Sequence, residues 1–206
     1  RNIGISDVYA SLNQLAAIEP TGFTPGGSSS DKLVRSEITP TFVYNTKNRV
    51  YNASEGRQLT ARVPFSGGPL GGGINIVRPQ IEFQQFAPDR LISGGRHTFG
   101  FRAAVSHIIP YGTLPGGLPM TVPFFERVFL GGEFDLRGFD IRSITPWAYT
   151  QTSASAEKGI MPVGGDTSVL ITGEYRVPLV GPLHVTGFID IGTSTILRKS
   201  NLMLFG

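Results

Sequence analysis

The sequence predicts an all-β fold, a transmembrane antiparallel β-barrel of which this chain supplies only a part. Apolar and polar residues alternate in segments of about 8–14 residues, which is longer than most strands of soluble sheets and suits tilted membrane strands. Turn-forming residues separate these segments, and the 206 residues include 27 glycines and 15 prolines. No apolar run of about 20 residues, the length that a membrane helix needs, occurs in the sequence.

The composition agrees with a wall that is apolar on one side only. Hydrophobic residues make up 40% of the chain and charged residues 16%, and the mean hydropathy is +0.03. Because only alternate residues of a barrel strand face lipid, the average resembles that of a soluble protein. A soluble all-β sandwich gives the same average, so composition alone leaves both folds open.

Seven segments carry the alternation from which the strands are predicted. The clearest of them alternates Leu59, Ala61 and Val63 with polar residues. In the last two segments the polar face includes Glu174 and Asp190, which would line the lumen of a barrel. The predicted strands are residues 33–44, 58–65, 73–86, 97–108, 126–132, 167–179 and 183–192.

Connections of unequal length join these segments. Short turns are predicted at 45–48, 67–72 and 180–182, and longer loops at 109–125 and 137–166. Bacterial outer-membrane barrels have short turns at one end and long loops at the other. A loop of about 30 residues is uncommon in a compact domain and is usually functional. We therefore look for the functional site in the second long loop.

Several kinds of chemistry find no support in the residues. The absence of cysteine excludes disulfides, thiolate metal sites and a cysteine nucleophile. His97, His107 and His184 lie far apart and lack the spacing of a metal site. The net charge of +3 is small and the basic residues are scattered, which argues against a nucleic-acid partner. No Gly-x-Ser-x-Gly elbow occurs, so we expect no catalytic residue, metal or cofactor.

Three motifs in a fixed order point to one family. The first is F-L-G-G-E-F-D-L-R-G-F at 129–139, the second extends from V-G-G-D at 163–166 to G-E-Y-R-V-P-L at 173–179, and the third is G-F-I-D-I-G at 187–192. Together they closely resemble the barrel domain of the BamA-type outer-membrane protein assembly factors, the bacterial surface antigen superfamily. The resemblance covers most of residues 33–195.

The resemblance implies an architecture for the chain. The family barrel has sixteen strands, and a chain of this length supplies roughly 8–10 of them. We expect one partial barrel domain over 1–206, best matched over 33–195, without the periplasmic POTRA repeats that precede the barrel in the family. Residues 1–10 lack the apolar core of a signal peptide, so an export signal is expected outside the chain.

The resemblance also implies the site. In the family the long loop, here 133–166, folds back into the lumen, where its arginine meets acidic residues of the inner wall. The matching acids are Glu174 and Asp190, and an arginine fork pairs well with carboxylates in a partly dehydrated lumen. Glycine would allow a close backbone approach at the tip, and the aromatic residue would wedge the tip against the wall. The motif residues are Leu136, Arg137, Gly138 and Phe139.

The function implied by the resemblance is insertion of β-barrel proteins into the bacterial outer membrane, without nucleotide or metal. The expected partners are outer-membrane lipid, client β-barrel proteins, and periplasmic lipoproteins or chaperones. The alternatives are a two-partner-secretion translocator, a passive outer-membrane pore, an outer-membrane enzyme and a soluble sandwich.

Overall fold

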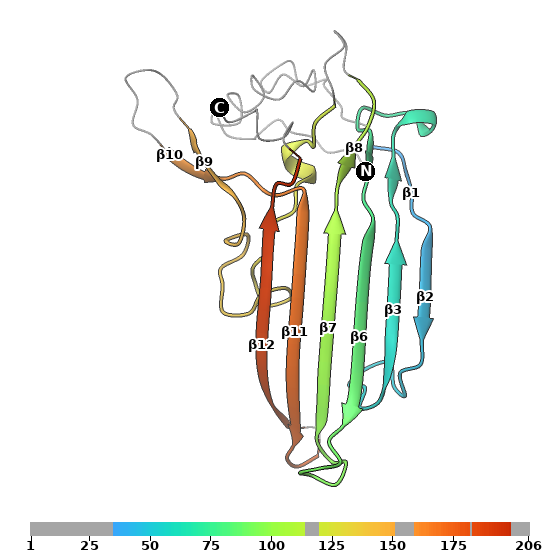
Figure 1. Cartoon of the computed structure of the whole chain (residues 1–206), viewed down its shortest axis with the longest axis vertical. Coiled ribbons are helices and arrows are strands. Elements are labelled where there is room, and N and C mark those ends of the chain that lie inside the picture. The colour runs from blue at the N-terminus through green and yellow to red at the C-terminus, as the bar shows by residue number, and fades with distance from the viewer. Residues whose placement is uncertain (1–34, 114–119, 151–158, 182, 199–206) are drawn as a thin grey trace.

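The main body of the protein is a six-stranded antiparallel sheet. The computed structural model describes residues 35–113, 120–150, 159–181 and 183–198. The sheet has the order β12-β11-β7-β6-β3-β2, so neighbouring long strands follow one another along the chain (Figure 1). Its strands are β2 (Thr41–Asn45), β3 (Gly56–Arg62), β6 (Gln80–Pro88), β7 (Thr98–His107), β11 (Thr167–Pro178) and β12 (His184–Thr195). The predicted all-β antiparallel fold is confirmed.

A smaller sheet continues four of these strands. It consists of β1 (Glu37–Ile38), β4 (Phe65–Ser66), β5 (Ile76–Val77) and β8 (Ile109–Pro110), in the order β1-β4-β5-β8. This order repeats that of β2, β3, β6 and β7, so each pair belongs to one extended path of the chain. The predicted strands 33–44, 58–65 and 73–86 are therefore each interrupted once within the described residues.

Prolines explain three of these interruptions. Pro40, Pro64 and Pro79 lie at the junction of the two sheets, and proline has no N–H to donate to a neighbouring strand. Their carbonyls still accept hydrogen bonds from the next strand, at 3.1 Å from Val63, 2.9 Å from Arg78 and 3.1 Å from His107. The strands therefore stay in contact across the junction while the regular ladder stops.

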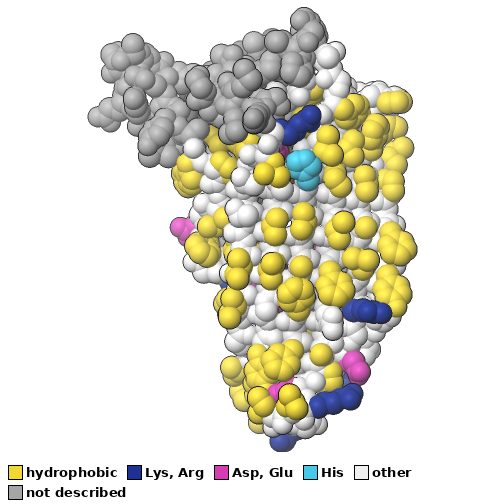
Figure 2. Space-filling model, in the orientation of Figure 1, with side chains coloured by type: hydrophobic (Ala, Val, Ile, Leu, Met, Phe, Trp, Pro, Cys, Tyr) yellow, Lys and Arg dark blue, Asp and Glu magenta, His cyan; other side chains and the backbone are white. Residues whose placement is uncertain are grey.

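The two faces of the main sheet differ sharply. On one face the apolar side chains are exposed, for example Ile81 at 56%, Ile171 at 40% and Ile189 at 71%. Figure 2 shows apolar side chains spread over this face with few charged ones among them. The other face carries polar and charged residues of the same strands, among them Thr60, Glu82, Arg102, Glu174 and Asp190. Such an exposed apolar face suits lipid and would be a liability in water.

The buried cores lie on the polar face, beneath the long connection that leaves β8 and returns at β11. One core consists of Ile74, Ile76, Ile108 and Val122, and the other of Leu130, Leu136 and Leu170. Each combines residues of the wall or its extension with residues of the connection. The connection is therefore packed against the inner face of the sheet.

The predicted strand 126–132 is wrong as a wall strand. The structure has a short 3₁₀ helix, η2 (Phe124–Glu126), followed by single bridges from Val128 to Gly165 and from Leu130 to Ile144. β7 pairs directly with β11 over ten residue pairs, so no strand lies between them. The two predicted loops thus form one connection that contains β9 (Trp147–Thr150) and β10 (Gly159–Pro162).

The connections separate into two groups at opposite ends of the wall. Residues 46–55, 89–97 and 179–183 join the strands at the lower end in Figure 1. The turn 67–75, which includes η1 (Gly68–Leu70), lies at the upper end together with the long connection. The prediction that grouped 67–72 with the other short turns is therefore wrong. No helix in the described ranges has the length and hydropathy needed to cross a bilayer.

The asymmetry of the faces predicts the effect of charge on each. Ile171→Arg, on the apolar face of β11, should lower the free energy of unfolding by about 2–4 kcal/mol, because it places a charge in lipid. Gln58→Arg, on the polar face of β3, should lower it by about 1 kcal/mol or less. Urea unfolding of the two variants in lipid vesicles, followed by heat-modifiability on gels, measures the difference. Equal losses would mean that the apolar face does not contact lipid.

Candidate functional site

The tip of the long connection closes into a compact turn on the inner face of the wall. The Gly132 N–H donates to the Phe139 carbonyl at 3.1 Å. Gly131 has φ 116° and lies so close to the Asp140 carbonyl that a Cβ would overlap it. Gly138 also has a positive φ, 85°. Glycine is required at such positions because side chains are strained there.

Arg137 joins this tip to two neighbouring wall strands. Its Nε and Nη2 donate to Asp190 Oδ2 and Oδ1 at 2.7 and 2.8 Å, which is a bidentate contact with β12. The Arg137 backbone N–H donates to the same Oδ2 at 3.1 Å. Nη1 donates to Glu174 Oε1 on β11 at 2.8 Å. The structure thus brings together the three charged residues that the sequence singled out.

The side chains that form these contacts are largely buried, which increases the contribution of the contacts to stability. The Asp190 side chain is 3% exposed, that of Glu174 19% and that of Arg137 25%. Surface ion pairs contribute little, but a carboxylate held away from water is strongly destabilised when its partner is removed. Asp190 is therefore the stronger of the two anchors.

Phe188 completes the site, although the sequence analysis did not identify it as a site residue. The Arg137 guanidinium carbon lies 3.7 Å from the centroid of the Phe188 ring, a close cation–π contact. Phe188 pairs with Glu174 across the β11–β12 ladder and precedes Asp190 by two residues, so all three side chains share one face. Because it lies two residues before Asp190 in a strand, the alternation could have placed Phe188 on the same face. We call Arg137, Glu174, Phe188 and Asp190 the arginine clasp.

Leu136, not Phe139, inserts the apolar part of the tip into the wall. Leu136 is 2% exposed and packs with Leu130 and Leu170, whereas Phe139 is 52% exposed. Space for Leu136 comes from Gly192 on β12, where a Cβ would lie 2.8 Å from Leu136 Cδ1. A Cβ at Gly138 would meet nothing within 4 Å, so that glycine serves backbone conformation and no close approach.

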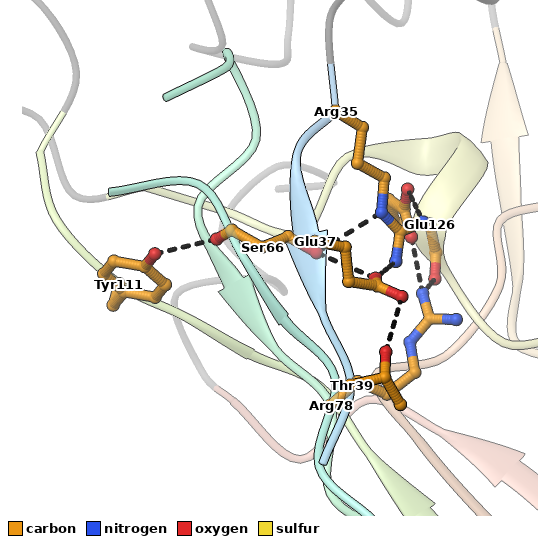
Figure 3. A network of polar contacts seen from close by, with 7 residues as sticks. All are labelled: Arg35, Glu37, Thr39, Ser66, Arg78, Tyr111 and Glu126. Atoms are coloured by element: carbon orange, nitrogen blue, oxygen red, sulfur yellow. Dashed lines mark hydrogen bonds and ion pairs between the residues drawn. The ribbon is translucent and has the colours of Figure 1, made fainter. Parts of the chain in front are cut away.

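A second polar cluster anchors the stem of the same connection (Figure 3). Glu126 is 5% exposed and accepts from Arg35 Nη1 at 2.7 Å and from Arg78 Nη2 at 2.6 Å. Glu37, on β1, also pairs with Arg35 and accepts from the Ser66 hydroxyl at 2.9 Å. Burial alone would raise the pKa of Glu37, but hydrogen bonds from Ser66, Arg35 and Thr39 lower it, so the group stays ionised. The alternation pattern had assigned Glu126 to a strand.

Between the wall and the connection lies a cavity of about 640 Å³. Arg62, Arg102 and Arg142 line it together with Glu82 and Asp135. Arg102 contacts both sides, because Nη2 donates to Glu82 at 3.1 Å and Nη1 to the Phe134 carbonyl at 3.3 Å. The inner space is thus polar and only partly filled by the connection. No group of His, Asp and Glu suited to a metal occurs among the residues that the structure describes.

Comparison with known proteins gives consistent matches. The Omp85 superfamily domain matches residues 1–201. The Outer membrane protein assembly factor BamA of Nitratidesulfovibrio vulgaris is 29% identical over 136 residues, which are 62% of this chain and 14% of that protein. The crystal structure of BamA from Haemophilus ducreyi lacking POTRA domains 1–3 is similar in fold, with a TM-score of 0.67 and 20% identity. It matches over 94% of this chain and 36% of the other. The chain thus spans a minor part of both relatives.

The geometry of the clasp predicts unequal coupling of Arg137 to its two acids. A double-mutant cycle of Arg137→Ala with Asp190→Ala should give a coupling of about 2–3 kcal/mol, because the two side-chain hydrogen bonds from the guanidinium to a buried carboxylate are lost. The cycle with Glu174→Ala should give about 1 kcal/mol, since Glu174 keeps Arg176 as a partner. Unfolding free energies in vesicles measure both. Coupling near zero in both cycles would show that the tip does not rest on this wall.

The space at Gly192 predicts a steric test of the tip. Gly192→Val should displace Leu136 and make the tip more accessible to protease, because the added side chain occupies the position of the Leu136 methyl group. Gly187→Val is the matched control on the same strand, where a Cβ meets nothing within 4 Å. Limited proteolysis of the folded variants compares them. Equal cleavage in both would contradict the packing of Leu136 on Gly192.

Proposed function

The chain belongs to the Omp85 superfamily, and we propose that it forms the loop-bearing part of the barrel wall in a BamA-like assembly factor, which inserts β-barrel proteins into the outer membrane. The family places the chain in the bacterial outer membrane, as the sequence predicts. Assembly activity, clients and partners belong to the proposal, because the chain spans 14% of its curated relative.

The observation that carries the proposal is the arginine clasp across β11 and β12. One guanidinium contacts two adjacent strands, at 2.8 Å to Glu174 and 2.7 Å to Asp190. A contact of this kind joins the inward-folded loop to the wall and braces one strand pair against the next. It supports a role in which part of a barrel must open while this part stays intact.

The mechanism follows from the cost of unpaired backbone in lipid. An open sheet edge leaves N–H and C=O groups without partners, and each such group costs several kcal/mol in a bilayer. A barrel with a seam that opens offers this edge to a client strand, which pairs with it by β-augmentation. The hydrogen bonds exchanged with the client supply the free energy, so no nucleotide, metal or catalytic residue is needed. The clasp would keep the loop and the neighbouring wall in place during the exchange.

The remaining parts of the proposal concern boundaries and partners. We assign 1–206 to one partial barrel domain and 133–166 to the lumen loop, of which 151–158 lie outside the described residues. Residues 33 and 34 of the predicted strand 33–44 also lie outside the described residues. The proposed partners are outer-membrane lipid, unfolded client barrels, and periplasmic lipoproteins or chaperones, with no nucleic acid.

Two other functions share the same wall. A two-partner-secretion translocator would move an extended client through the lumen, and a passive pore would conduct solutes. The packed tip, with Leu136 at 2% exposure, argues against free conduction. Channel recordings of the complete protein would favour a pore if large steady conductance persisted with the clasp intact.

Removal of the clasp arginine tests the proposal directly. In the complete protein reconstituted in vesicles, Arg137→Ala should reduce insertion of a client β-barrel about tenfold, since a loss of about 1.4 kcal/mol changes a rate by that factor. Arg142→Ala is the matched control, because its guanidinium lies 5.1 Å from the Phe129 ring and forms no ion pair among the described residues. Insertion is measured by protease protection of the client. Equal insertion by both variants would refute the role of the clasp.

A further inference from the structure

A second connection reaches the clasp wall from the opposite end. Residues 46–55 join β2 to β3, yet they also contact β6, β11 and β12. Lys47 Nζ donates to Gln84 Oε1 on β6 at 3.4 Å. Asn52 Oδ1 accepts from Arg176 Nη1 on β11 at 3.4 Å, and Asn52 Nδ2 lies 3.2 Å from His184 Nε2 on β12. This turn therefore crosses the polar face near the lower end of the wall.

The turn has a defined internal structure. Asn48 Oδ1 accepts from the backbone N–H groups of Ser54 and Glu55 at 3.2 and 3.4 Å, and its Nδ2 donates to the Ser54 hydroxyl at 2.8 Å. Ala53 is 4% exposed, although it lies in a turn. Asn52 adopts φ 51°, a left-handed conformation that asparagine tolerates better than most residues. The amide of Asn52 is thus presented to the wall by a folded segment.

Glu174 contacts Arg137 of the long connection through one carboxylate oxygen, and through the other it contacts Arg176 of β11, which reaches the turn. Oε1 accepts from Arg137 of the long connection at 2.8 Å. Oε2 accepts from Arg176 Nε and Nη2 at 3.0 and 2.6 Å. Arg176 also lies 5.1 Å from the Phe86 ring, which leaves Nη1 directed to Asn52. A continuous series of contacts therefore joins the loop tip to the turn at the other end.

We propose that Glu174 couples the long loop to the turn 46–55, with Arg176 as the positioning residue of that turn. When Arg137 is bound, the carboxylate is held between two guanidiniums, and this fixes the orientation of Arg176. When Arg137 leaves, the carboxylate is free to rotate toward Arg176 alone, and the guanidinium moves relative to Asn52. Release of the loop tip, which belongs to the connection from the upper end, therefore loosens the turn at the lower end.

This coupling goes beyond the proposed function; the two share the Arg137–Glu174 contact, and the coupling also needs the contacts of Arg176 with Glu174 and Asn52. It requires that the loop tip and the turn 46–55 influence each other. By thermodynamic linkage, the effect is equal in both directions. It does not require that the protein insert clients. A protein that transports or conducts would have the same coupling, so either idea can fail without the other.

These 206 residues contain no cysteine, so an introduced cysteine is the single attachment site for a probe within them. Val50→Cys, at a position 80% exposed in the turn, is labelled with a nitroxide in the complete protein folded in detergent, and its mobility is recorded. Arg176→Lys should increase the mobile fraction by about fivefold, and Arg137→Ala should do so by a similar factor although Arg137 does not touch the turn. Arg102→Lys is the control, because it weakens another loop–wall contact that does not involve Glu174.

The reverse experiment keeps the proposal falsifiable if Arg137→Ala disturbs folding. A nitroxide at Phe139→Cys reports on the loop tip, and Asn52→Ala removes the contacts of the turn with Arg176 and His184. The tip should become more mobile by about fivefold in Asn52→Ala, with the clasp residues unchanged. A tip unaffected by Asn52→Ala, or a turn that responds to Arg137→Ala no more than to Arg102→Lys, would overturn the coupling. If Arg137→Ala reduced client insertion but left the mobility of the nitroxide at Val50→Cys unchanged, the coupling would be refuted and the proposed function would stand.

Discussion

A carboxylate at Asp190 lies almost fully buried on the inner face of the wall, and its need for a partner determines where the long connection goes. An unpaired charge in such a place costs several kcal/mol. Within the described residues its cationic partner is Arg137, which lies 53 positions earlier in the chain and binds with both its side chain and its backbone N–H. The loop tip therefore cannot leave the lumen without exposing or protonating this group. Leu136 adds an apolar contact in the space left by Gly192.

The other governing constraint is the pairing of backbone groups in lipid. Six long strands keep regular ladders, and three of these ladders, β2–β3, β3–β6 and β6–β7, end at the row of Pro40, Pro64 and Pro79. Because prolines remove donors that lipid could not replace, we interpret this row as the limit of the membrane-embedded wall. Beyond it, the small sheet buries isoleucines against Val122 of the connection. The extension and the stem of the connection thus stabilise each other outside the lipid.

Three arginine sites hold two connections to one wall. Glu126 receives Arg35 and Arg78 at the stem, the clasp holds the tip, and Arg176 contacts the turn at the far end. Arginine suits this task because its planar group donates in several directions at once and stays charged. A wall braced at three levels is compatible with a barrel that opens elsewhere. It also means that a change at the tip has a physical route to the other end.

By itself, the sequence determined the all-β class, the apolar and polar faces, and the positions of Glu174 and Asp190 on one face, because alternation with period two depends only on local geometry. Residues 126–132 show why this information is limited. They alternate as a strand does, yet β7 pairs with β11 instead, since pairing depends on partners distant in the chain. The arrangement of Arg137 against its acids came from family resemblance, and its functional role stays a prediction.

Only the tertiary structure decided which neighbours share the site. Three contacts depend on segments that are far apart in sequence. They are the contact of Phe188 with Arg137, the insertion of Leu136 instead of Phe139, and the contact of the turn 46–55 with Arg176. The physical reason is that local patterns assign each side chain to a face, whereas packing and charge pairing choose which faces and loops meet. In this protein the ion pairs of Asp190 and Glu174 with Arg137 form only in the folded structure, and they determine which loop meets which face.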